Sequence, residues 1–245
     1  MSEEPPQSPQ DPGPLMLGQG YLLSAFSPVA ATFRFIERDF RGAFLPLFGA
    51  AVLGSLETLS LLLGLASEVS TMIVLLILWL PVSSYCGASM LAFALRVARG
   101  EPYRGRDVWR YHPSTPRYAL LKLLGYGVFG GLSYAASTLM QRLAKVQQAL
   151  LFLAIPLVIV LLVVLLVRLL LAPVVIVDRR VNPLEAARDS LRLTRGNTGT
   201  LAIYGMVLSM IAGMGQAIGG LAVLNALATP GLVYLYQTLR GEPPA

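Results

Sequence analysis

Few residues of this chain have the types and spacing that catalysis or metal binding requires. The 245 residues include one histidine, His112, and one cysteine, Cys86. A site with two or three histidine ligands, a thiolate cluster or an intramolecular disulfide therefore cannot form within one chain. A Ser–His–Asp triad needs a histidine beside a buried serine, but His112 lies in a polar segment between Tyr111 and Pro113. We expect no enzyme activity, no metal site and no cofactor.

Glycines in two apolar runs are better explained by helix packing than by ligand binding. The segment 125–131 (GYGVFGG) superficially resembles a nucleotide-binding loop, but it lies inside an apolar run and not between a strand and a helix. Gly127 and Gly131 form a small-xxx-small pair, and a second small-residue stripe runs from Gly205 to Gly213. Such stripes permit close contact between helices in lipid.

The composition is typical of a protein embedded in a membrane. Hydrophobic residues make up 55% of the chain and charged residues only 13%, whereas a soluble domain has about 45–50% and about 25%. So few charges cannot cover a water-facing surface of this size. The composition therefore argues against an ordinary soluble enzyme, a disordered chain and a secreted disulfide scaffold.

The apolar runs predict an all-α polytopic fold with six transmembrane helices. A helix needs about 20 apolar residues to cross the hydrocarbon core, and none of the runs alternates as barrel strands do. The expected spans are 43–65, 72–95, 118–140, 149–172, 198–219 and 221–239, with a tight hairpin at Gly219–Gly220. They form a single domain over residues 15–241, between a disordered proline-rich tail at 1–14, which does not resemble a signal peptide, and a short tail at 242–245.

Basic residues in the short loops predict the orientation. Sixteen lysines and arginines fall on the side that holds both termini and the loops after the second and fourth spans, against Arg142 and Lys145 on the other. The positive-inside rule therefore puts both termini in the cytoplasm. The net charge of +6 is explained by this topology, and we expect no nucleic-acid partner. The expected location is the bacterial inner membrane.

Two cytoplasmic segments have the pattern of amphipathic helices lying on the membrane. Residues 28–41 follow Ser27 with a proline, and residues 183–195 follow Asn182 with a proline, as at a capped helix start. Each places apolar side chains on one face and charged ones on the other. The candidate contacts with anionic lipid are Arg34, Arg38, Arg188, Arg192 and Arg195; the alternative is that these arginines serve topology alone. The segment 101–117 also begins with X-Pro, which suggests three degenerate repeats of an amphipathic helix and two spans.

Two charges fall inside the expected spans, where charges are costly. Arg168 lies near the cytoplasmic end of its span, so its side chain is expected to reach the headgroups. Glu57 lies deeper and leaves three interpretations: it reaches the outer interface, it is buried as a protonated or hydrogen-bonded structural group, or it lines a solute or proton pathway.

Several motifs resemble YciC-like bacterial inner-membrane proteins and the membrane domain of multi-span glycerophosphodiester phosphodiesterases. They are Pro173–Asp178, Asn182–Ala186 with Ser190, Thr194 and Asn197, Arg99-Gly-Glu101, and Tyr236–Arg240. The resemblance covers roughly residues 25–241 and implies a six-span membrane protein. The catalytic phosphodiesterase domain is absent, so the resemblance implies architecture and location but no enzyme activity. Asp178 with its neighbouring arginines is expected to form an interfacial ion cluster.

The function that these observations favour is that of a non-catalytic accessory or scaffold protein for envelope or lipid-related machinery. Its partners would be the lipid bilayer, anionic lipids and other membrane proteins. The alternative is a small transporter or permease with a cavity near Glu57. An intramembrane enzyme is disfavoured, because the sequence offers no catalytic pair.

Overall fold

The computed structural model describes residues 21–65, 69–146, 156, 160, 163–213 and 218–241. Within these ranges the chain is helical and contains no strand, which confirms the all-α class. The elements, in chain order, are α1 (Tyr21–Arg38), the π-helix η1 (Phe40–Phe44), α2 (Leu45–Leu65), α3 (Val69–Ala98), the 3₁₀ helix η2 (Gly105–Trp109), α4 (Thr115–Val146), α6 (Ala172–Arg179), α7 (Pro183–Leu193), α8 (Thr198–Gly213) and α9 (Ile218–Leu239). The expected tail at 1–14 lies outside the described residues.

The helices follow most of the expected apolar runs, with one clear error. The predicted spans 43–65, 72–95 and 118–140 correspond to α2, α3 and α4, whereas much of 149–172 lies outside the described residues. The predicted hairpin at Gly219–Gly220 is wrong, because both glycines lie inside α9. A glycine costs a helix only about 1 kcal/mol relative to alanine, so a pair of them in an apolar run does not force a turn.

The described helices do not support six spans. By length and composition one helix, Leu76–Ala98 within α3, is able to cross a membrane. The pair Ser27–Arg38 and Phe40–Leu56, bent by 104°, adds a second if it is counted as one broken span.

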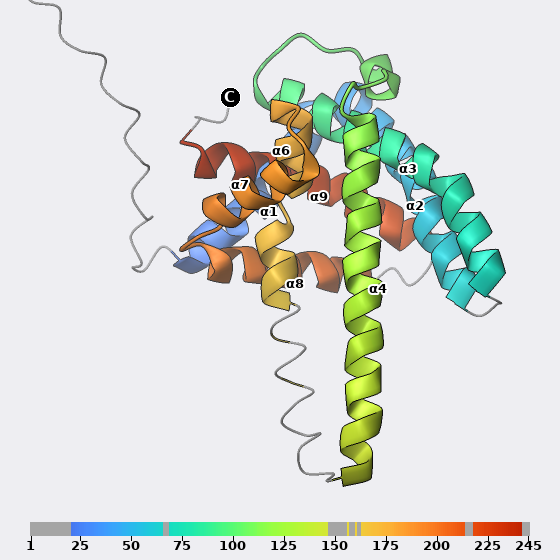
Figure 1. Cartoon of the computed structure of the whole chain (residues 1–245). Helices are drawn as coiled ribbons and strands as arrows, with labels where there is room; N and C mark the ends of the chain where they lie inside the picture. Colours follow the sequence, from blue (N-terminus) through green and yellow to red (C-terminus); the bar gives the residue numbers. More distant parts are fainter. Residues whose placement is uncertain are drawn as a thin grey trace, which may run out of the picture.

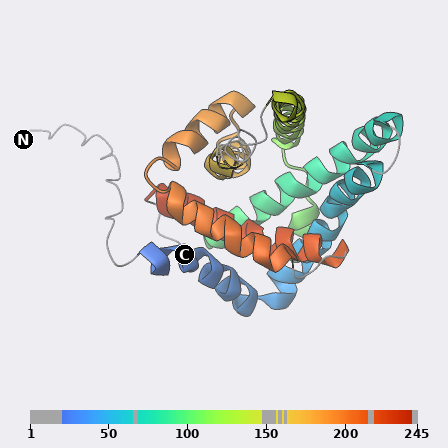
Figure 2. The same cartoon turned by 90° about the horizontal axis from the view of Figure 1, so that it is seen from below.

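The helices pack in two directions. α2 lies beside α3 and contacts α9, while α1 packs on α8 and α9 (Figures 1 and 2). α4 contacts α3, α6 and α7, runs steeply across the direction of α8 and α9, and extends beyond the other described helices at its C-terminal half (Figure 1). The described helices therefore do not form one parallel bundle.

The N-terminal amphipathic helix differs from its predicted boundaries. Residues 28–41 were expected to form one helix with Pro28 at its start, but α1 begins at Tyr21 and Pro28 lies inside it. The helix ends at Arg38, because Asp39 leaves the helical conformation and its side chain accepts a hydrogen bond from Gly42 N (2.7 Å). The chain thus turns sharply between α1 and α2.

The close contacts expected from the glycine stripes are found elsewhere. A Cβ added at Gly127 or Gly131 would meet no atom within 4 Å among the described residues. At Gly231 it would collide with the Tyr204 hydroxyl and lie 3.1 Å from Thr32 Oγ1. A glycine thus permits close packing where α1, α8 and α9 meet.

Candidate functional site

A buried carboxylate joins the ends of three helices. Asp178, near the end of α6, has a side chain only 6% exposed. Its Oδ1 accepts a hydrogen bond from Arg99, just after α3, and its Oδ2 accepts from Arg240 (2.7 Å), just after α9. Tyr236 Oη in α9 also donates to Oδ2 (2.7 Å), and Arg240 donates to the same phenol oxygen (2.9 Å). We call these four residues the Asp178 cluster.

The Asp178 cluster fixes the relative position of α3, α6 and α9. A buried carboxylate is tolerated only when charges and hydrogen bonds replace the lost water, and here two guanidinium groups and a phenol do so. The predicted pairing of Asp178 with its neighbouring arginines is wrong, because its cations come from distant segments. Arg179, the sequence neighbour of Asp178, instead pairs with Asp189 of α7. The cluster also brings together three of the motifs that carry the family resemblance.

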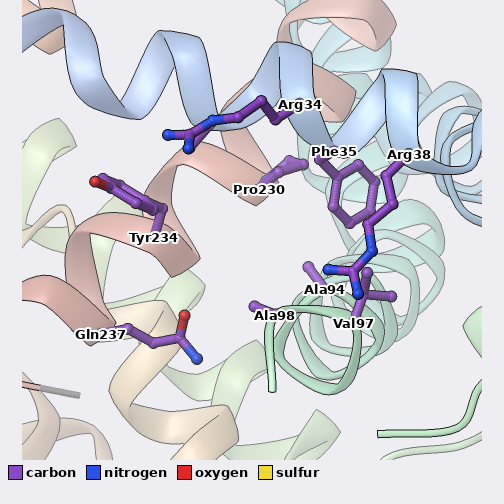
Figure 3. A pocket seen from close by; sticks show the side chains of 10 residues that line it. Arg34, Phe35, Arg38, Ala94, Val97, Ala98, Pro230, Tyr234 and Gln237 are labelled. Carbon is purple, nitrogen blue, oxygen red and sulfur yellow. The ribbon is translucent and has the colours of Figure 1, made fainter. Parts of the chain in front are cut away.

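A cavity of about 190 Å³ lies beside this cluster, between α1 and the C-terminal ends of α3 and α9 (Figure 3). We call it the Arg–Gln pocket. Two guanidinium groups lie on its α1 side, and an amide lies opposite (Figure 3). Its lining is Ala31, Arg34, Phe35, Arg38, Ala94, Val97, Ala98, Pro230, Tyr234 and Gln237.

Gln237 is the polar group on the floor of the pocket. It is 2% exposed, and its Oε1 has no hydrogen-bond partner among the described residues. A buried amide oxygen left without a donor costs about 1–3 kcal/mol. The cavity offers far more than the roughly 10–15 Å³ that one water molecule needs. A molecule that enters the pocket with a hydrogen-bond donor would satisfy this oxygen.

The Asp178 cluster holds the walls of the pocket. Arg99 directly follows Ala98, which lines the pocket, and Tyr236 directly precedes Gln237. The ends of α3 and α9, which form two walls of the pocket, therefore bind the same carboxylate. Arg34 and Arg38 were predicted from the sequence, but Gln237 was not; the available signal was an amide inside the Tyr236–Arg240 motif.

The helix α7 forms as the sequence predicts at its start. Asn182 accepts a hydrogen bond from Glu185 N (2.9 Å), and Pro183 occupies the first turn. Leu184, on the predicted apolar face, is 68% exposed. Small residues of α7 pack inward instead: Pro183, Ala186 and Ser190.

Arg168 forms hydrogen bonds that the sequence did not predict. Its backbone carbonyl accepts hydrogen bonds from Ser190 Oγ (2.7 Å) and Thr194 Oγ1 (3.4 Å). Its guanidinium donates to Leu191 O (3.4 Å), while its Nε is buried without a partner in the described part of the chain. Arg168 therefore contacts α7, and its expected reach to the headgroups stays a prediction.

The other candidate lipid contacts are not brought into the Arg–Gln pocket. Arg188, Arg192 and Arg195 are exposed on α7 or just after it. Arg188 borders a separate apolar groove with Leu120 and Leu184. These arginines are thus free to meet a charged surface but do not converge on one site.

Glu57 lies in α2, but its side chain lies outside the described residues. Near it, Asn225 of α9 donates a hydrogen bond from Nδ2 to Ser55 Oγ (3.0 Å). The three interpretations of Glu57 therefore stay predictions.

The connection between α3 and α4 carries two groups with shifted pKa values. Burial, with a hydrogen bond to Asp39 (3.0 Å), raises the pKa of the Tyr103 phenol. Burial, together with nearby Arg180 and Arg96, lowers the pKa of His112. Accordingly, His112 Nδ1 accepts a hydrogen bond from Ser114 N (3.3 Å), as only an unprotonated nitrogen does.

Comparison with known proteins gives one match. No curated protein and no solved structure matches the chain. Residues 115–239 match a family described as a domain of unknown function (DUF7847). The match includes Asp178, Tyr236 and Gln237, and it covers 125 of the 245 residues. The chain therefore belongs to the DUF7847 family.

Proposed function

We propose that the chain is an integral multi-pass protein of the bacterial inner membrane that acts without catalysis, as an accessory or scaffold for envelope or lipid-related machinery. It has six spans, and both termini face the cytoplasm. The resemblance described above implies the same architecture. The proposal places the Asp178 cluster and the Arg–Gln pocket at the cytoplasmic surface, because Arg34, Arg38, Arg99 and Arg240 are among the sixteen basic residues predicted to face the cytoplasm.

The observation that carries the proposal is the distribution of side chains on α3 and α4. Large apolar residues point outward: Val74, Ile77, Leu78, Leu120, Leu123, Leu124 and Val128 are all at least 44% exposed. Hydroxyl groups point inward: Ser83, Ser84 and Ser89 are buried. Exposure of this many large apolar side chains is unfavourable in water and favourable in lipid.

The junction of α1 and α2 also supports a membrane location. The 104° bend at Asp39 suits one helix lying in the membrane plane and a second helix entering it. Phe33 and Phe40 are both more than half exposed next to this bend. Arg34 and Arg38 lie on the same segment and supply the charges that an interfacial helix needs.

Cysteine labelling in intact cells tests the location and the number of spans. In a Cys86→Ala background, single cysteines are introduced at Glu101, Gln141, Arg195 and Gln216. Glu101, Gln141 and Arg195 are exposed, which makes them better reporters than the fully buried Ser114. Six spans require labelling by an impermeant maleimide at Gln141 and Gln216, and protection at the other two until the cells are opened.

The pattern of labelling also separates the alternatives. Labelling at Gln141 with protection at Gln216 would reduce the number of spans, because α8 and α9 would then not cross. Labelling at Glu101 from outside would contradict the orientation. Recovery of the protein in the soluble fraction after mild carbonate extraction would overturn the membrane location.

The transporter alternative has one supporting observation, the polar contact of Asn225 with Ser55 close to Glu57. We expect Glu57→Gln and Glu57→Ala to match the wild-type chain in expression, thermal stability and cellular phenotype if the protein is a scaffold. Loss of phenotype in Glu57→Gln with normal stability would instead favour transport.

A further inference from the structure

The Arg–Gln pocket has the charge of an anion site. Arg34 and Arg38 are one helical turn apart on α1, so their side chains leave the helix on the same face. No acidic residue lines the pocket. Neither arginine forms an ion pair with any residue in the described ranges. The pocket therefore presents two positive charges to whatever enters it.

Guanidinium groups favour phosphate over a simple monovalent anion. Each offers several N–H donors in a planar fork, which matches the oxygens of a phosphate or carboxylate. Two such forks at the rim of one cavity suit a group with three or more oxygens. A phosphate ester has these oxygens and its negative charge at neutral pH.

Gln237 provides the second, independent requirement. Its amide is almost fully buried, it projects into the cavity opposite the arginines, and its Oε1 lacks a donor (Figure 3). Inorganic phosphate has its only O–H donors on the same phosphorus whose oxygens the arginines would bind. A phosphate ester with a neighbouring hydroxyl would bring the donor that Oε1 lacks.

The apolar lining completes the site. Ala94, Val97 and Phe35 also line the cavity. They exclude water from the carbon atoms of an ester that bridges the two polar ends. In such an environment, the hydrogen bonds of a charged group are stronger than in water.

We propose that the Arg–Gln pocket binds a phosphate ester that carries a hydroxyl group near the phosphate. Arg34 and Arg38 bind the phosphate oxygens, and Gln237 accepts a hydrogen bond from the hydroxyl. This chemistry is shared by the headgroup of a phospholipid such as phosphatidylglycerol and by a soluble ester such as glycerol 3-phosphate. Only the lipid source rests on the proposed membrane location, and the experiment separates the two sources.

The test measures ligand-induced thermal stabilisation of the full-length protein in detergent. The probes are phosphatidylglycerol, phosphatidylcholine, glycerol 3-phosphate and inorganic phosphate. A ligand that binds only the folded state raises the unfolding temperature with its concentration. We expect stabilisation by phosphatidylglycerol or glycerol 3-phosphate, and at least tenfold weaker apparent affinity for phosphatidylcholine and inorganic phosphate.

Two sets of variants assign the binding to the pocket. Arg34→Gln with Arg38→Gln should weaken the apparent affinity at least tenfold. The matched control, Arg106→Gln with Arg110→Gln, removes the same charge from exposed positions between α3 and α4 and should change the apparent affinity less than threefold. Equal losses in both double variants would indicate a general electrostatic attraction and overturn the proposal.

Gln237→Leu distinguishes a ligand group from a structural one. Leucine keeps the apolar volume and removes an unpaired buried oxygen, so the unliganded protein should be as stable as the parent or more so. Binding of the hydroxyl-bearing ester should fall about tenfold to the level of the probes without a hydroxyl. Destabilisation with unchanged affinity would overturn the role of Gln237.

The outcomes also separate this site from the proposed function. Stabilisation by glycerol 3-phosphate alone identifies a soluble ligand and leaves the labelling result to decide the membrane location. Stabilisation by phosphatidylglycerol alone identifies the lipid. The absence of stabilisation by any hydroxyl-bearing probe would overturn the site, even if cysteine labelling supports every predicted span.

Discussion

Asp178 and Tyr236 are 58 residues apart in the sequence, and the Tyr236 hydroxyl donates a 2.7 Å hydrogen bond to the Asp178 carboxylate. The same carboxylate binds Arg99 and Arg240, so a single side chain of α6 connects the ends of α3 and α9. These helix ends are two walls of the Arg–Gln pocket. The cluster therefore fixes the relative position of these two walls.

Removing the charge of Asp178 should destabilise the protein. In Asp178→Asn two guanidinium groups lose their anion, and losses of about 3–5 kcal/mol are typical when a buried pair is broken. Arg99 and Arg240 are about a third exposed, so screening reduces the expected loss in free energy of unfolding to about 2 kcal/mol. Denaturant titration in detergent measures it. The control Asp189→Asn removes a more exposed pair with Arg179 and should cost under about 1 kcal/mol; equal losses would contradict the central role of Asp178.

A methyl group at Gly231 should disturb the junction of α1, α8 and α9. The added Cβ would collide with the Tyr204 hydroxyl, so Gly231→Ala is expected to cost about 1–3 kcal/mol of stability through overpacking. At Gly205 of α8 the same change meets no atom of the described residues within 4 Å, and the helix should gain up to about 1 kcal/mol. Unfolding temperatures of the two variants should thus move in opposite directions. A stable Gly231→Ala protein would show that this junction is looser than described.

The Ser190 hydroxyl of α7 should hold this helix to the segment that contains Arg168. Ser190→Ala leaves the Arg168 carbonyl without its 2.7 Å donor and should lower the free energy of unfolding by about 1–2 kcal/mol. Hydrogen exchange should rise in α7 more than in α2 or α3. Ser137→Ala is the control, because Ser137 Oγ donates only to Tyr134 O on its own exposed helix face, and this change should be close to neutral.

Stability should fall as the pH drops below neutral, because of His112. Burial and nearby Arg180 and Arg96 lower the pKa of His112 beneath its ordinary value of 6.5, so the unfolded chain binds the proton more tightly than the folded chain. The stabilisation that comes from keeping His112 unprotonated is present in full above pH 6.5. It is lost as the pH falls through 6.5 toward the pKa of His112 in the folded state. Unfolding temperatures between pH 7.5 and 5 measure the loss. His112 is the only histidine in the chain, so His112→Asn should flatten the profile in this range; an unchanged slope would assign it to other groups.

Local patterns predicted much of the secondary structure. The apolar runs located α2, α3 and α4, and Asn182 followed by Pro183 marked the start of α7, because the capping side chain acts within three residues of itself. Predictions of helix boundaries were wrong where the local signals were weak. Pro28 did not start α1, and the glycine pair at 219–220 did not end a helix.

By itself the sequence determined the all-α class, the apolar and basic pattern and the choice of Arg34 and Arg38, since composition and periodicity are properties of neighbouring residues. Only the tertiary structure decided what those residues meet. The partners of Asp178 come from α3 and α9, Arg168 is tied to α7, and Gln237 lies opposite the two arginines. These relationships depend on how separate helices pack, because hydrogen bonds and ion pairs between distant segments leave no periodic signal in the chain.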